Sequence, residues 1–157
     1  MAANIVEPTP EQFLQGNIKA LYTAADSKAF EAAFDTFLPE DGHVTITLNG
    51  QSMSRAQYKK VIAGETFDEA KGTVAFTGAL QTPAKADIAG TAAVSFTANI
   101  TKKLLVEGKP SVTVVTSCLI VVLEDHKSKS AHGVHGGVTN HQRIVSLTQL
   151  LVEQNNQ

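Results

Sequence analysis

The hydrophobic residues in the first 38 positions recur at helical spacing, in two segments. The first segment begins after Thr9, a residue that can cap a helix, and Pro10 suits the first helical position. Its apolar residues share one predicted face and are Phe13, Ile18, Leu21 and Tyr22. A cap at Asp26 or Ser27 is expected to open the second helix, whose apolar residues are Phe30, Phe34, Phe37 and Leu38. Pro39 and Gly42 are expected to end it.

The segment "HVTITLNGQSMS" predicts a short β-hairpin. A strand over residues 44–48 runs into Asn49 and Gly50, a pair that suits a two-residue turn in which both residues have positive φ. Ser54 and Gln57 then have the spacing of a capping box, which predicts a third helix. Gly64 is placed to end that helix.

Beyond residue 70 the pattern changes from helical to alternating. Long strands are predicted over residues 73–81, 91–105, 111–124 and 142–153. The segments between them have the composition of turns or loops, which favours an antiparallel meander. This order of elements predicts one α+β domain over residues 1–157, with three helices packed on one face of a curved, mostly antiparallel sheet.

The last two predicted strands are apolar on both faces. In a sheet with one solvent-exposed face, apolar and polar residues should alternate along each strand. In residues 111–124, Val112, Val114, Cys118, Ile120 and Val122 share one face, and Val115, Leu119, Val121 and Leu123 share the other. In the final strand, Ile144, Leu150 and Val152 oppose Val145, Leu147 and Leu151. The helices can cover one of these faces. We expect a second copy of the chain to cover the other in a homodimer, with the carboxyl-terminal tail or a loop as the alternative.

Composition and charge narrow the function classes. The formal net charge is -2 with no basic cluster, so neither nucleic acid nor a membrane surface is an expected partner. The single cysteine, Cys118, excludes an internal disulfide and lies in an apolar run, which predicts a small buried residue. The amino terminus lacks a secretory pattern and no apolar run is long enough to cross a bilayer. We therefore expect a cytoplasmic protein.

Four of the five histidines lie in one segment, "DHKSKSAHGVHGGVTNH". His132 and His135 could bind zinc together with His126 or His141. A metal site requires ligands on rigid elements with partners for their free nitrogens, and Gly133, Gly136 and Gly137 favour flexibility instead. We interpret the segment as a solvated loop, with a lid over a pocket as the second possibility and a metal site as the third.

With this order of elements, the chain resembles the nuclear transport factor 2-like superfamily of cone-shaped α+β folds. The matching stretches are "FLQGNIKALYTAADSKAFEAAF", "VTITLNGQSMSRAQYKKVI" and "HQRIVSLTQLLVE". Relatives include ketosteroid isomerase, scytalone dehydratase and cyclases of the SnoaL type. The resemblance implies a cystatin-like cone with a pocket between the helices and the sheet, and dimers formed through the sheet.

The resemblance also suggests site residues. Tyr22 looks like the tyrosine that hydrogen-bonds the substrate oxygen in the steroid isomerases, but the first strand carries no carboxylate for their base. Chemistry similar to that of scytalone dehydratase would require His43 with Asp41 or Asp35. Alternatively, Tyr22 is a core residue and His43 lies at a strand end, partly in solvent. The predicted ligand-binding residues are Tyr22, Phe34, Tyr58, Asn99, Thr116 and Thr148.

The leading functional prediction is a binding protein for a small, mostly apolar molecule, without an evident catalytic acid–base pair, cofactor or metal. The alternative is a lyase or isomerase that uses Tyr22, His43 and a nearby aspartate such as Asp41. A third possibility is a protein-interaction or transport adaptor.

Overall fold

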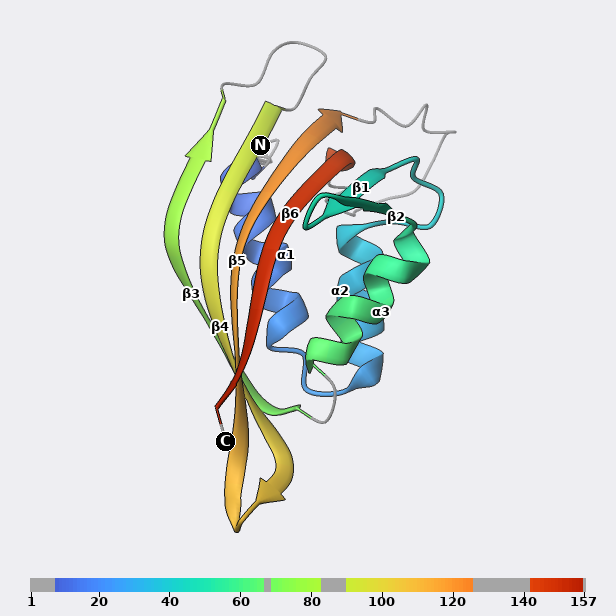
Figure 1. The fold of residues 1–157 in the computed structure, drawn as a ribbon. Helices are drawn as coiled ribbons and strands as arrows, with labels where there is room; N and C mark the ends of the chain where they lie inside the picture. The colour runs from blue at the N-terminus through green and yellow to red at the C-terminus, as the bar shows by residue number, and fades with distance from the viewer. Residues whose placement is uncertain (1–7, 67–68, 83–89, 126–141, 157) are drawn as a thin grey trace, which may run out of the picture.

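The computed structural model describes residues 8–66, 69–82, 90–125 and 142–156. Three helices lie on one side of a curved six-stranded sheet (Figure 1). The predicted α+β architecture is therefore confirmed. No helix in the described ranges is both long and apolar enough to cross a bilayer.

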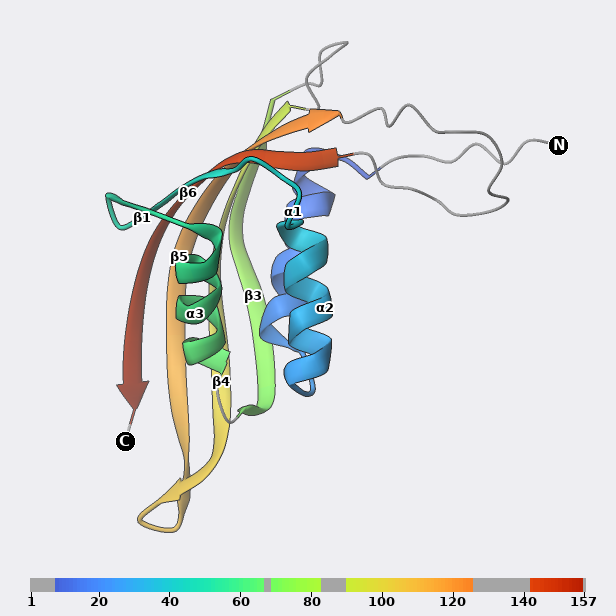
Figure 2. The same ribbon diagram turned by 90° about the vertical axis from the view of Figure 1, so that its right-hand side faces the viewer.

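The first two helices form where the sequence predicts them. Helix α1 spans Pro10–Tyr22 and has a complete capping box, in which Thr9 and Gln12 each accept a hydrogen bond from the other's backbone N–H. Helix α2 spans Ser27–Phe37, and the Asp26 carboxylate accepts a hydrogen bond from the backbone N–H of Ala29 at 2.7 Å. The two helices run side by side in opposite directions (Figure 2).

The hairpin and third helix follow. Strands β1 (Thr45–Leu48) and β2 (Gln51–Met53) are joined by Asn49 and Gly50, whose φ angles are 50° and 79°. Helix α3 spans Arg55–Thr66, so the prediction that Gly64 ends it is wrong. A glycine ends a helix when it adopts a left-handed φ, and Gly64 is not among the glycines with such an angle.

The long strands are β3 (Glu69–Gln81), β4 (Gly90–Val106), β5 (Lys109–Asp125) and β6 (Gln142–Asn156). Each pairs antiparallel with the next, which confirms the predicted meander. Strand β1 pairs parallel with β6, and the sheet order is β2-β1-β6-β5-β4-β3. The β4–β5 hairpin extends beyond the helices (Figures 1 and 2). Its turn contains Glu107 and Gly108, which both have positive φ angles.

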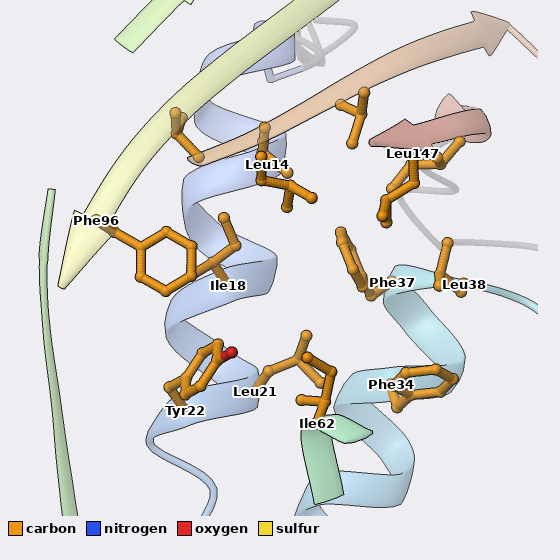
Figure 3. Packing of buried hydrophobic residues seen from close by; sticks show 14 of the residues in the cluster. Leu14, Ile18, Leu21, Tyr22, Phe34, Phe37, Leu38, Ile62, Phe96 and Leu147 are labelled. Carbon is orange, nitrogen blue, oxygen red and sulfur yellow. The ribbon is translucent and has the colours of Figure 1, made fainter. Parts of the chain in front are cut away.

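The inner face of the sheet packs on the helices. Residues of β4 alternate between buried and less buried positions, and the buried set is Ala92, Val94, Phe96, Ala98 and Ile100. In β5 the predicted set Val115, Leu119, Val121 and Leu123 is also buried. Figure 3 shows how side chains from α1, α2, α3 and the sheet meet in this core. Burial of this apolar surface is the main force that holds the helices on the sheet.

One face assignment in the last strand is wrong. Regular alternation predicts that Ile144 shares a face with Leu150 and Val152, but Ile144 is 4% exposed and lies in the core, whereas Leu150 is 62% exposed. The cause is a β-bulge. Val122 pairs with Ser146 but Leu123 pairs with Ile144, so one extra residue reverses the alternation.

Two glycines provide a matched test of backbone conformation. A Cβ added at Gly16 or Gly50 would meet no atom within 4 Å, so neither change creates a clash. Gly16→Ala in α1 is expected to stabilise the protein by about 0.5–1 kcal/mol because it reduces the freedom of the unfolded chain. Gly50→Ala is expected to destabilise it by about 1 kcal/mol because φ is +79°.

Urea denaturation of both variants measures these differences. Equal shifts of the two unfolding midpoints, or a stabilised Gly50→Ala variant, would contradict the assigned turn.

Candidate functional site

The described core contains one buried carboxyl group, that of Glu65 in the last turn of α3. The residue is 2% exposed. Its Oε2 accepts a hydrogen bond from the Tyr22 hydroxyl at 2.6 Å. Its Oε1 has no hydrogen-bond partner in the described part of the chain. A buried carboxyl oxygen without a partner is unfavourable, which marks this position as a candidate functional site.

The length of α3 explains why Glu65 is buried. Tyr58, Ile62 and Glu65 follow the i, i+4, i+7 spacing of one helical face, and all three are buried. Because the helix continues past Gly64, the carboxyl group is carried into the apolar space beside α1. Lys102 of β4 holds this helix end against the sheet, since its Nζ donates to the Glu65 backbone carbonyl at 2.6 Å.

Burial controls the ionisation of this site. Desolvation raises the pKa of Glu65 most, and the nearby Glu153 carboxylate raises it further. The Tyr22 hydrogen bond and the Lys102 charge lower the pKa, and the net result is a pKa of about 7. Burial and then the Glu65 charge raise the pKa of both Tyr22 and Tyr58, so both phenols stay protonated at neutral pH.

A second buried polar chain lies beside the first, and its hydrogen bonds are made within the protein. The Tyr58 hydroxyl donates to Gln149 Oε1 at 2.6 Å, and Gln149 Nε2 donates to Ser117 Oγ at 2.8 Å. Ser117 Oγ donates to the backbone carbonyl of Leu150 at 2.9 Å. This network of hydrogen bonds connects α3 to β6 and β5. It offers a ligand fewer unpaired hydrogen-bonding groups than the Glu65 carboxyl does.

The structure divides the predicted ligand-binding residues between the two faces of the sheet. Tyr22, Phe34 and Tyr58 are buried on the helix side, where the Tyr22 ring lies 5.4 Å from that of Phe96 (Figure 3). Phe34 packs under Arg55 and Lys59, whose cationic groups lie 5.0 and 5.4 Å from its ring centroid.

The other three predicted residues, Asn99, Thr116 and Thr148, are exposed. The β4–β5–β6 register places them on the outer face of the sheet, away from the helices. They are not brought together with Tyr22 and Glu65.

The predicted catalytic partners of Tyr22 also lie elsewhere. His43 and Asp41 are exposed and follow the carboxyl end of α2, whereas Tyr22 is the last residue of α1 and precedes the amino end of α2. They line a shallow cleft of about 320 Å³ with Gly42, Glu124, Arg143, Ile144 and Val145. Asp41 forms an ion pair with Arg143 at 2.7 Å, and Tyr22 is not part of the cleft.

The histidine-rich segment 126–141 lies outside the described residues. Within the described ranges, no group of three or more His, Cys, Asp or Glu side chains could hold a metal ion.

Glu65 is the residue that sequence reasoning missed. Its signal is the i, i+4, i+7 spacing of Tyr58, Ile62 and Glu65, which places a carboxyl group on an otherwise apolar helix face. Ending the predicted helix at Gly64 hid that signal.

Comparison with known proteins supports the fold. No protein-family model matches the sequence, and no curated protein matches it either. A solved structure of a candidate aromatic ring hydroxylase from Novosphingobium aromaticivorans is similar, with a TM-score of 0.58 and 10% identity over 94% of this chain and 92% of that one.

Two further solved structures are similar over most of the chain. The Kfla4162 protein from Kribbella flavida has a TM-score of 0.56 and 14% identity, over 90% of this chain and 88% of that one. An NTF-2 like protein of unknown function from Pseudomonas aeruginosa has a TM-score of 0.51 and 11% identity, over 88% of this chain and 94% of that one. Likeness at such low identity shows the fold alone.

The raised pKa of Glu65 predicts a pH-dependent stability. A carboxyl group whose pKa is about 7 when folded and 4.5 when unfolded binds more protons in the folded state between those values. Its contribution to stability is complete below pH 4.5 and is lost as the pH rises through 7. We expect the free energy of unfolding of the wild type to fall relative to that of Glu65→Gln by about 3 kcal/mol between pH 4.5 and 8.

Urea denaturation of both proteins across this pH range provides the measurement. Glu107→Gln, at an exposed position on the β4–β5 turn, is the control and should follow the wild type closely. Parallel pH profiles for the wild type and Glu65→Gln would show that Glu65 is not held in a desolvated site.

Proposed function

The chain has the nuclear transport factor 2-like fold, and on that premise we propose that it binds a small, mostly apolar molecule between its helices and the inner face of its sheet. The observation that carries the proposal is the unpartnered Oε1 of the buried Glu65 carboxyl. A buried polar atom without a partner lowers stability, so its presence in a core favours a functional role.

The surroundings of Glu65 suit a ligand of this kind. The residues that pack around the Tyr22–Glu65 pair in the core are apolar or aromatic, and they include Ile18, Ile62 and Phe96. Such walls favour an apolar body, and one carboxyl oxygen favours one polar group. A ligand hydroxyl or amine would donate to Oε1, while Tyr22 keeps Oε2 occupied.

The direction of the Tyr22 hydrogen bond affects what the tyrosine can do. Its hydroxyl already donates to Glu65 at 2.6 Å, so it would have to release that bond before it could donate to a ligand oxygen. While its hydroxyl keeps the hydrogen bond to the carboxyl group, Tyr22 acts as a positioning residue for Glu65. The polar contact for the ligand is then the carboxyl group.

One observation favours an enzyme as the second candidate function. A carboxyl group with a pKa of about 7 can take up and return a proton near neutral pH, which is the property that a general acid–base catalyst requires. Glu65 would supply the acid–base group that His43 and Asp41 were expected to supply. The corresponding reaction class is proton transfer at a carbon atom of a bound apolar carbonyl compound.

Paired ligands test the binding function. The probes are substituted phenols and alicyclic alcohols, each compared with its methyl ether, and the readout is the melting temperature. In the wild type we expect at least one alcohol to bind about tenfold or more tightly than its ether, because only the alcohol can donate to Glu65. In Glu65→Met this preference should disappear, and in Glu124→Met, an exposed control, it should remain.

Two results would oppose the proposal: no probe raises the melting temperature of the wild type, or the preference for the alcohol survives in Glu65→Met.

Deuterium exchange separates the enzyme from the binding protein. Cyclic ketones are incubated with the protein in D₂O, and mass spectrometry follows deuterium uptake next to the carbonyl group. If Glu65 is a general base, the wild type is expected to exchange about 100-fold faster than Glu65→Gln, since Gln cannot accept the proton. Equal deuterium-exchange rates in the wild type and Glu65→Gln would contradict catalysis by Glu65 and leave only the binding function.

A further inference from the structure

The β4–β5 hairpin carries a cluster of exposed aliphatic side chains near its turn. Leu104 is 66% exposed, Leu105 is 58% exposed and Val106 is 40% exposed, and the three residues are consecutive at the end of β4. Single exposed leucines are common on protein surfaces, but three adjacent aliphatic residues at the end of a projection are not. We refer to residues 102–110 as the hairpin tip.

The hairpin tip stands apart from the rest of the described chain. The pairing of β3 with β4 ends at Lys102, and the pairing of β6 with β5 ends at Val112, so neither neighbouring strand continues along the tip. The three helices also stop short of it (Figures 1 and 2). A two-stranded ribbon without cover is only marginally stable in water, so contact with another surface would stabilise it.

Positive charge surrounds the aliphatic cluster. The hairpin tip contains Lys102, Lys103 and Lys109 and one acidic residue, Glu107, which gives it a net charge of +2, whereas the whole chain has a net charge of -2. Lys103 and Lys109 are exposed. The charge of the whole chain, which predicts no membrane partner, therefore conceals a local excess of positive charge.

This composition fits a lipid surface better than a protein surface. Protein interfaces are enriched in tyrosine, tryptophan and arginine and depleted in lysine, and the hairpin tip has none of the first three. At a bilayer surface, aliphatic side chains enter the acyl boundary while lysine ammonium groups stay among the headgroups. Anionic headgroups attract those ammonium groups.

We infer that the hairpin tip is a docking site for a membrane surface that contains anionic lipid. Leu104, Leu105 and Val106 enter the lipid interface, and Lys103 and Lys109 contact the anionic headgroups. Glu107, in the turn, carries the charge of the tip that opposes this contact. Because the apolar cluster is small, the binding is reversible, with half of the protein bound at roughly 1 mM accessible lipid.

The hairpin tip begins beside the candidate functional site. Lys102 Nζ donates to the Glu65 backbone carbonyl at 2.6 Å, so the base of the tip contacts the end of α3 that carries Glu65. An apolar molecule dissolves preferentially in lipid, so docking would bring the candidate site close to a reservoir of such molecules. This relation rests on the proposed function, whereas the docking itself does not.

Sedimentation with sucrose-loaded vesicles measures the docking. Phosphatidylcholine vesicles that contain about 30% phosphatidylserine should bind the wild type at least tenfold more tightly than vesicles of phosphatidylcholine alone, because each lysine near an anionic surface contributes roughly fivefold. No small apolar ligand is present in this assay, so a failure of the proposed function would leave the result unchanged.

Substitutions in the hairpin tip separate its two contributions. The double variant Leu104→Gln and Leu105→Gln should bind anionic vesicles at least tenfold more weakly than the wild type, because it removes aliphatic surface from the contact. The double variant Lys103→Gln and Lys109→Gln should bind about 25-fold more weakly, and Glu107→Gln should bind about fivefold more tightly.

Matched controls make the same changes away from the hairpin tip. Leu80→Gln replaces a leucine of β3 that is 76% exposed, and the double variant Lys28→Gln and Lys60→Gln removes two exposed lysines of α2 and α3. Both controls should bind anionic vesicles within about twofold of the wild type. Circular dichroism of each variant confirms that it is folded.

A tryptophan provides a readout of insertion that does not depend on affinity. The chain contains no tryptophan, so an introduced one is the only indole fluorophore. With anionic vesicles, the emission of Leu105→Trp should shift to shorter wavelength and should be quenched by brominated lipid. Leu80→Trp should show neither effect.

Four results would overturn the inference. The wild type fails to bind anionic vesicles, or its binding survives both double substitutions in the hairpin tip, which would place the contact elsewhere. Binding without quenching of Leu105→Trp would show adsorption by charge alone. A lower mass of the Leu104→Gln and Leu105→Gln variant in sedimentation equilibrium, without vesicle binding by the wild type, would show that the tip contacts another protein chain instead.

Discussion

Burial of the apolar inner face of β4, β5 and β6 against the helices is the interaction on which the rest of the structure depends. It positions α1, α2 and α3 and excludes water from the space between the layers. The same exclusion desolvates the Glu65 carboxyl and raises its pKa to about 7. It also leaves the outer face without helices. The candidate site is thus a consequence of this packing arrangement.

Much of this arrangement could be predicted from local sequence signals. The caps at Thr9 and Ser54, the Asn49–Gly50 turn and the alternating strands each act over a few residues, and each formed as expected. The errors arose where a long-range contact decides the outcome. A bulge opposite Val122 and Leu123 placed Ile144 in the core, and packing beside α1 extended α3 past Gly64.

The candidate site was harder to predict than the fold. The resemblance to the steroid isomerases singles out Tyr22, and the alternative interpretation, that Tyr22 and Tyr58 are core residues, predicts their observed burial. Whether Asn99, Thr116 and Thr148 face inward depends on register, which local pattern does not determine. Glu65 was missed because an acidic residue near a predicted helix end is normally assigned to solvent. Its partner lies 43 residues away in the chain, on another helix.

The bulge in β6 has a consequence for how the chain tolerates insertions and deletions. Removing Val145 would make Ile144 the immediate neighbour of Ser146 and leave both in their present pairings with β5, as regular alternation requires. Removing one residue between Leu147 and Leu151 would instead turn every side chain on one side of the gap to the opposite face. Relatives that differ in length within this strand should therefore carry the gap at Val145, and their shallow cleft beside His43, which Val145 lines, should differ in shape.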